Sequence, residues 1–190
     1  MTKTELYKAL NYVNHSREKR LSYANLIINT PKLVLPLLEI MFEVNDKISC
    51  RAAWVFEFMC SKKLEPLIPH LDVFTKNISK IHLDSAVRPV AKVCELLAKT
   101  YYKKEASEIK THLTQTHKEH IIEACFDWMI NSKEKVAPKA YGMNALYHLG
   151  KEFNWIYPEL IIILERDFAT QSAAFKARAR QILKKIKPKN

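Results

Sequence analysis

The sequence predicts an all-α protein built from pairs of helices that stack on one another. Apolar residues recur at spacings of three and four along almost the whole chain, and no stretch shows the sustained alternation of a strand. Only two glycines are present, which leaves little material for Gly-rich phosphate loops or tight hairpin turns. These observations disfavour most nucleotide-binding α/β folds.

The helix boundaries follow from capping residues and from breaks in the apolar pattern. Thr30 followed by Pro31 fits an N-cap with proline at the first helical position, Asp84 opens another helix, and Gly150 lies just past the end of a third. The predicted helices cover residues 3–13, 16–28, 31–43, 47–60, 64–79, 85–103, 107–131 (with a break), 135–149, 156–168 and 172–186.

A short pattern recurs in the second helix of four pairs: a small residue, an apolar or small residue, and then a base. The bases are Arg51, Arg88, Lys139 and Lys176, which follow one another at intervals of 37, 51 and 37 residues. The longer middle interval implies an insertion of roughly 14 residues. The polar segment 104–117 can supply it.

Two segments carry the clearest signature of a known repeat. Residues 64–71 (LEPLIPHL) and 83–91 (LDSAVRPVA) resemble the HEAT-repeat consensus, with a proline-led first helix and an Asp-x-x-Val-Arg turn into the second. The resemblance covers about residues 31–186, and a looser pair precedes it in which Arg20 is a candidate for the basic position. It implies a right-handed α-α superhelix of about five HEAT-like helix pairs.

We expect a single α-solenoid domain over residues 1–190, because a helix pair with two apolar sides must stack on its neighbours to bury them. The approximate repeats are 3–28, 31–60, 64–103, 118–150 and 156–186, with the polar insertion at 104–117.

Two interpretations of the basic row formed by Arg51, Arg88, Lys139 and Lys176 stay open. In HEAT proteins, which this chain resembles, the residue at this position often bonds acids or carbonyl groups of adjoining repeats, and Asp46 and Asp84 are placed to take part here. Alternatively, the row is an open groove that contacts phosphates or an acidic peptide. The first interpretation predicts buried, paired side chains, and the second predicts exposed ones.

The last predicted helix has one apolar face and one basic face, as 3.6 residues per turn requires. The basic stripe contains Lys176, Arg180, Lys184 and Lys187, and the chain as a whole has a net charge of +11. The stripe fits the polar cap that a terminal repeat needs for solubility, and it also fits binding to nucleic acid or another anionic surface.

The expected function is non-catalytic binding of a protein segment, most simply an acidic one, on the concave face formed by the second helices. No Ser/His/Asp order, HExxH or GxGxxG motif supports an enzyme, and no cofactor is expected. The alternative is a nucleic-acid-binding protein that resembles the HEAT-like alkylpurine DNA glycosylases. Those enzymes place a carboxylate among aromatic residues, and Glu57, Glu95 and Asp127 match by residue type alone.

Other residues argue for a cytoplasmic protein without a metal site. The N-terminus lacks the long apolar core of a signal peptide, and Leu33–Val44 is interrupted by Pro36 and acids, so no transmembrane segment is expected. Three further groups of side chains, the histidines, the cysteines and two tryptophans, have their own expectations. His112, His117 and His120 form no complete ligand set, Cys50, Cys60, Cys94 and Cys125 are expected reduced in the core, and Trp54 and Trp128 are also expected there.

Overall fold

A computed structural model describes residues 1–131 and 133–187, and the described part of the chain contains helices and turns but no strand. The α-helices are α1 (Lys3–Leu10), α2 (Arg17–Asn29), α3 (Val34–Met41), α4 (Lys47–Lys62), α5 (Leu71–Asn77), α6 (Asp84–Tyr101), α7 (Glu108–His112), α8 (Gln115–Ile130), α9 (Val136–Leu149), α10 (Ile156–Phe168) and α11 (Ala173–Ile186). Three 3₁₀ segments are η1 (Pro31–Leu33), η2 (Glu65–His70) and η3 (Ile78–Lys80).

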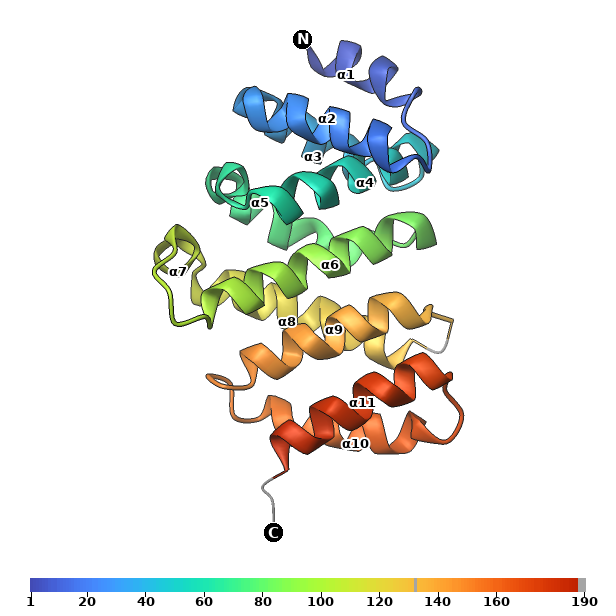
Figure 1. Cartoon of the computed structure of the whole chain (residues 1–190), viewed down its shortest axis with the longest axis vertical. Helices are drawn as coiled ribbons and strands as arrows, with labels where there is room; N and C mark the ends of the chain where they lie inside the picture. Colours follow the sequence, from blue (N-terminus) through green and yellow to red (C-terminus); the bar gives the residue numbers. More distant parts are fainter. Residues whose placement is uncertain (132, 188–190) are drawn as a thin grey trace.

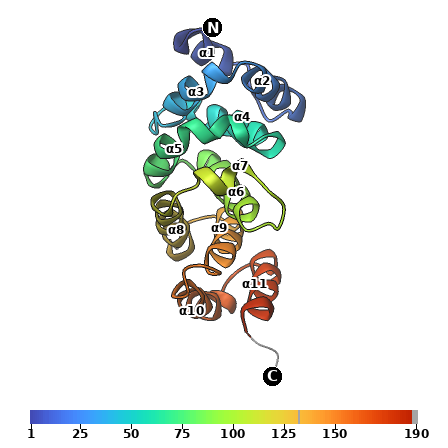
Figure 2. The ribbon, with the colours of Figure 1, turned by 90° about the vertical axis from the view of Figure 1, so that its left-hand side faces the viewer.

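The helices form two layers that run the length of the molecule (Figure 1). Helices α1, α3, α5, α8 and α10 are the first helices of five pairs and form one layer, while α2, α4, α6, α9 and α11 are the second helices and form the other (Figure 2). Neighbouring second helices pack on one another along their layer, and α4, α9 and α11 also pack on α3, α8 and α10, the first helices of their own pairs. The predicted all-α solenoid of about five helix pairs is confirmed.

Side-chain caps fix where several helices begin. Thr2 and Glu5 form a reciprocal capping box at the start of α1, and the side chains of Ser16, Asp46 and Ser172 accept hydrogen bonds from backbone N–H groups of α2, α4 and α11. These bonds satisfy donors that have no partner within the helix. The capping residues in the short polar turns therefore fix the residue at which these helices begin.

Two of the predicted helices are divided into shorter segments. Residues 64–79 form η2, α5 and η3 instead of one α-helix, and residues 31–43 form η1 followed by α3. Pro69 has no N–H to donate and its ring would clash with the preceding turn, so continuous α-geometry across it is unfavourable. The predicted break within 107–131 is present, because α7 ends at His112 and α8 begins at Gln115.

A continuous apolar core lies between the two layers. Phe56 of α4 and Phe74 of α5 are fully buried, with ring centroids 5.2 Å apart. All four cysteines are buried free thiols, as predicted, and burial raises the pKa of Cys60, Cys94 and Cys125. They behave as small apolar side chains rather than as reactive groups.

Within the described residues, no single helix has both the length and the apolar character needed to cross a membrane. The combination of Arg17–Asn29 with Pro31–Met41 passes by length and composition alone, and its two parts are bent by 112°.

Candidate binding groove

Two members of the basic row contact the preceding repeat. Arg88 of α6 donates two hydrogen bonds to Glu57 of α4, with Nη2 2.6 Å from Oε2 and Nη1 3.2 Å from Oε1. Arg51 of α4 donates to the backbone carbonyl oxygens of Leu10 and Asn11, at the end of α1. These contacts join neighbouring helix pairs, and the carboxylate partner is Glu57 rather than Asp46 or Asp84.

The other two members of the row have different surroundings. Lys139 of α9 is only 1% exposed, and it lines a small pocket together with Arg166 and Asp167. Lys176 of α11 is partly exposed near the end of the solenoid. The four bases occupy equivalent repeat positions, but they do not form one open basic row.

The terminal stripe lies on α11, the last helix of the second layer. The guanidinium of Arg180 lies 5.1 Å from the ring centroid of Phe168, Lys187 forms a 2.5 Å ion pair with Glu165, and Lys184 is exposed. The helix contains five basic residues and no acid. Its apolar residues Phe175, Ala179 and Ile182 are buried, so α11 both closes the core and presents a cationic surface.

A groove of about 480 Å³ opens on the second-helix layer, across the starts of α2, α6 and α9 and the middle of α4. Figure 1 shows these four helices running across the molecule one above the other. The lining residues are His15, Arg20, Trp54, Asp84, Ser85, Arg88, Lys135, Ala137 and Pro138. One face of the solenoid therefore combines an aromatic ring, two arginines and a lysine.

Trp54 contacts residues of two neighbouring repeats within this groove. Its indole Nε1 donates a hydrogen bond of 2.8 Å to the carbonyl oxygen of Ser85, and its ring lies 5.0 Å from the imidazole of His15. Trp54 was expected in the core, but the structure leaves it partly exposed. Its spacing of three residues from Arg51 could have indicated the second-helix surface, since residues three apart share a helix face.

The cations of the groove differ in how they are held. Arg20 donates a 2.7 Å hydrogen bond to the carbonyl oxygen of His15, and its guanidinium lies 4.9 Å from the ring centroid of Phe58. Lys135 forms a 2.7 Å ion pair with Asp84, and this pairing raises the pKa of Lys135. Sequence analysis identified Arg20 as a repeat position but missed Lys135, which lies just before α9.

The three carboxylates that matched glycosylases by residue type are dispersed. Glu57 is bonded to Arg88, Glu95 accepts from Lys92 at 2.5 Å and from Asn144 at 2.6 Å, and Asp127 lies on the opposite layer in α8. None of the three lines the groove, whose carboxylate is Asp84, paired with Lys135.

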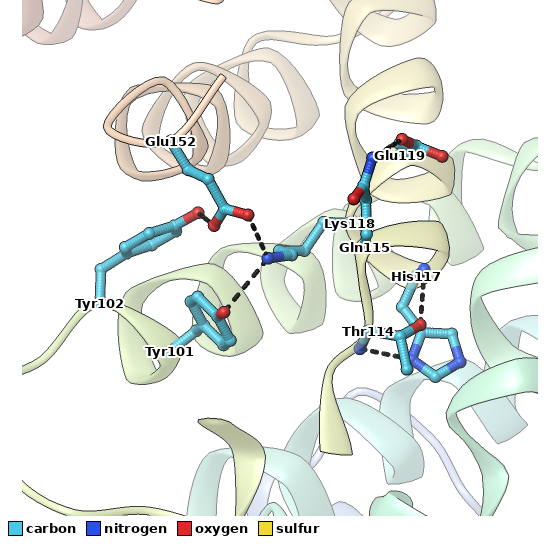
Figure 3. Close-up of polar contacts among 8 residues, drawn as sticks. All are labelled: Tyr101, Tyr102, Thr114, Gln115, His117, Lys118, Glu119 and Glu152. Carbon is cyan, nitrogen blue, oxygen red and sulfur yellow. Dashed lines mark hydrogen bonds and ion pairs between the residues drawn. The ribbon is translucent and has the colours of Figure 1, made fainter. Parts of the chain in front are cut away.

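A second polar cluster links α6, α8 and the α9–α10 turn (Figure 3). Lys118 Nζ is 2.6 Å from Glu152 Oε1 and 3.2 Å from the Tyr101 hydroxyl, while the Tyr102 hydroxyl donates to Glu152 at 2.6 Å. Burial alone would raise the pKa of Glu152, but the hydrogen bonds from Lys118 and Tyr102 outweigh it and lower that pKa. Burial and the same carboxylate raise the pKa of Tyr102.

The histidines of the insertion and of α8 take structural positions. His117 Nε2 lies 2.7 Å from Asp72 of α5, while its Nδ1 accepts from the backbone N–H of Thr114 in a capping box. His120 lies 3.4 Å from the hydroxyl of Thr75. In residues 1–131 and 133–187, no three His, Cys, Asp or Glu side chains are grouped as metal ligands.

Comparisons with known proteins agree with the geometry. A family model described as a HEAT repeat domain matches residues 6–186, nearly the full length of the chain. No curated protein matches the chain, and no solved structure matches it.

Proposed function

The chain belongs to the HEAT-repeat family, and from this premise we propose that it is a non-catalytic scaffold that holds an acidic segment of a partner protein in the groove of its second-helix layer. Helical repeat proteins present extended surfaces on which a partner chain can lie across several repeats. The observation that carries the proposal is the groove around Trp54, which crosses four of the five second helices.

The charges of the two layers support an anionic partner. The five second helices contain fifteen Lys and Arg residues and four Asp and Glu residues, whereas α1, α3, α5, α8 and α10 contain five and nine. A surface of one sign attracts partners of the opposite sign and speeds their association. An acidic segment is therefore drawn to the layer that carries the groove.

The side chains of the groove can recognise carboxylates directly. A guanidinium has five N–H donors, and Arg88 uses two of its nitrogens on Glu57, so donors remain for a second carboxylate. Arg20 donates to the backbone carbonyl oxygens of His15 and Ser16 and lies over the ring of Phe58, and within the described residues no carboxylate is paired with it. Trp54 adds an apolar surface on which an aliphatic or aromatic side chain of the segment can pack.

An acidic protein segment fits the groove better than a nucleic acid does. Asp84 lines the groove together with Arg88 and Lys135, and a phosphate backbone would lie against this carboxylate. A peptide can place its few acids at Arg20 and Arg88 and keep apolar residues elsewhere. A nucleic acid carries a negative charge at every phosphate, so it cannot place uncharged groups against the acidic side chain of Asp84.

The test is a fluorescence-anisotropy titration with two matched double charge reversals. The probe is a labelled 15-residue peptide rich in Glu and Leu, and the competing probes are labelled single- and double-stranded DNA and RNA at several salt concentrations. We expect the peptide to bind the wild type and to bind Arg20→Glu/Lys135→Glu at least tenfold more weakly. Arg180→Glu/Lys184→Glu, which changes the same charge outside the groove, should bind as the wild type does.

Two outcomes contradict the proposal. Peptide binding that survives Arg20→Glu/Lys135→Glu places the site elsewhere. Nucleic-acid binding that falls steeply with salt and is lost in Arg180→Glu/Lys184→Glu, together with no peptide binding, supports the alternative in which the terminal stripe contacts phosphates.

A further inference from the structure

Helices α8 and α10 lie in the first-helix layer (Figure 2), and the groove lies on the other layer. Together α8 and α10 carry exposed apolar side chains and acids. Ile130 is 54% exposed, Trp155 is 53% exposed and Ile162 is 59% exposed. An open pocket of about 440 Å³ lies between Phe126, Ile130, Trp155, Glu159 and Ile163. This concentration of large apolar groups differs from the scattered single residues of an ordinary surface.

The pocket has a defined aromatic wall. The rings of Phe126 in α8 and Trp155 at the start of α10 are stacked, with centroids 5.7 Å apart and planes inclined by 20°. Ile162 lies one helical turn beyond Glu159 and so extends the apolar face along α10. Tryptophan in such a position supplies a large contact area with little loss of conformational freedom.

Acidic side chains border this apolar face. Glu119, Glu123 and Asp127 follow one another at intervals of four along α8, and all three are exposed. Burial and the neighbouring charge of Glu123 raise the pKa of Asp127, as expected for carboxylates that lie close together. Glu159 adds a fourth acid on α10, at the edge of the pocket.

The cations on these two helices do not neutralise the acidic border. Lys118 is turned inward and bonded to Glu152, and Arg166 is bonded to Asp167, with Nε 2.6 Å from Oδ1. In a chain with a net charge of +11, this face is therefore locally negative. Its charge is complementary to a cationic partner and opposite to that of the groove.

We propose that the face formed by Phe126, Ile130, Trp155 and Ile162, bordered by Glu119, Glu123, Asp127 and Glu159, docks a basic amphipathic segment of a second partner protein. An apolar side chain of the segment enters the pocket beside Trp155, and lysines or arginines on its flanks pair with the acids of α8. Apolar anchors supply affinity and the charges fix orientation.

A second copy of this chain is a poorer occupant. Its most basic helix, α11, buries the apolar residues Phe175, Ala179 and Ile182 in its own core and packs Leu183 and Ile186 against the same core. That helix can offer charge to the acidic border but has no matching anchor for the pocket. The occupant is therefore a segment that carries both features on one exposed face.

The test uses an 18-residue helical peptide of Leu and Lys with one apolar face, and a scrambled peptide of the same composition as its control. Binding is followed through the fluorescence of Trp155 in a Trp54→Phe/Trp128→Phe background, in which Trp155 is the one tryptophan left of the three. We expect Glu123→Lys/Asp127→Lys and, separately, Ile130→Asn to weaken binding at least tenfold. Arg20→Glu/Lys135→Glu, on the other layer, should leave it unchanged.

Three results would overturn this proposal. Equal binding of the scrambled peptide shows that charge alone acts, and undiminished binding to Glu123→Lys/Asp127→Lys or Ile130→Asn places the peptide elsewhere. Concentration-dependent dimerisation of the wild type that Ile130→Asn abolishes, measured by light scattering, assigns the face to a second copy. Far-ultraviolet circular dichroism of each variant confirms that it is folded. Because the groove and this face lie on different layers, either proposal can fail without the other.

Discussion

Lys118 of α8 and Glu152 of the α9–α10 turn form a 2.6 Å ion pair in which the lysine is only 4% exposed. Lys118 also lies over the ring of Tyr101, 4.4 Å from its centroid. The pair ties the end of α6 and the beginning of α8 to the next repeat (Figure 3). It therefore acts across the point where the insertion interrupts the regular spacing of the helix pairs.

Glu152→Ala should lower the free energy of unfolding by about 3 kcal/mol, because it leaves the buried Lys118 ammonium without a carboxylate. The double variant Lys118→Met/Glu152→Ala should recover most of this loss, since methionine fills the same space without a charge. Urea unfolding of the two variants measures both values. Equal stability of the single variant and the wild type would show that solvent replaces the carboxylate.

Arg88→Ala should destabilise the fold by about 2 kcal/mol, because Glu57 is largely buried and loses two charge-assisted hydrogen bonds. Arg88→Ala/Glu57→Ala should cost less than the sum of the two single changes, since the pair acts as a unit. Thermal unfolding of the wild type, both single variants and the double variant gives the coupling energy. Strict additivity would mean that the two side chains contribute independently.

The two glycines respond oppositely to alanine. A Cβ at Gly150 would lie 2.2 Å from a ring carbon of Tyr157, so Gly150→Ala forces the ring to move and should cost about 2–3 kcal/mol. A Cβ at Gly142 meets the Cys125 backbone at ordinary contact distance, so Gly142→Ala should stabilise α9 by about 0.5 kcal/mol. Chemical denaturation of both variants checks the contrast, and a stable Gly150→Ala protein would contradict it.

Stability should fall as the pH decreases from 6.5 towards 4, because His148 resists protonation in the folded state. Burial, and then the charges of Lys151 and Lys185, lower its pKa to about 4. The unfolded chain binds this proton near pH 6.5, so the folded state loses relative stability across that window.

His148 is partly solvated, so we expect a loss of about 1–2 kcal/mol between pH 7 and pH 5. Urea unfolding at these two pH values, for the wild type and His148→Gln, measures it. The variant should show a smaller loss, and an identical pH dependence in both proteins would assign the effect to other groups.

The spacing of apolar residues and the capping, proline and glycine residues at the helix ends predicted the fold, because these features lie within each helix or next to it. Thr30–Pro31 and Asp84 mark boundaries that the structure places within a residue of the prediction, and the basic repeat at Arg51 and Arg88 identified the second helices. Gly150 ends α9 as predicted, but it has a right-handed conformation, with φ of −62°. Its close approach to Tyr157 depends on α10, which no local pattern contains.

The candidate groove was less accessible to sequence reasoning because its walls come from different repeats. Lys135 and His15 lie in turns outside the repeat pattern, and Trp54 has apolar neighbours that resemble a core segment. The burial of Lys118 could not be predicted for the same reason, because its partner Glu152 is 34 residues away in the sequence. Spacing along one helix identifies a shared face, but it does not show which side chains of another repeat cover that face.

The opposite charges of the two layers give the molecule an electric moment across its short axis, perpendicular to the direction in which the repeats stack. A charged partner that approaches in dilute salt experiences a torque that turns the protein before the surfaces touch. An anionic chain and a cationic chain would be turned towards opposite sides and would therefore not compete. Because the Debye length shortens to about 8 Å at physiological ionic strength, this orientation acts only during the final approach.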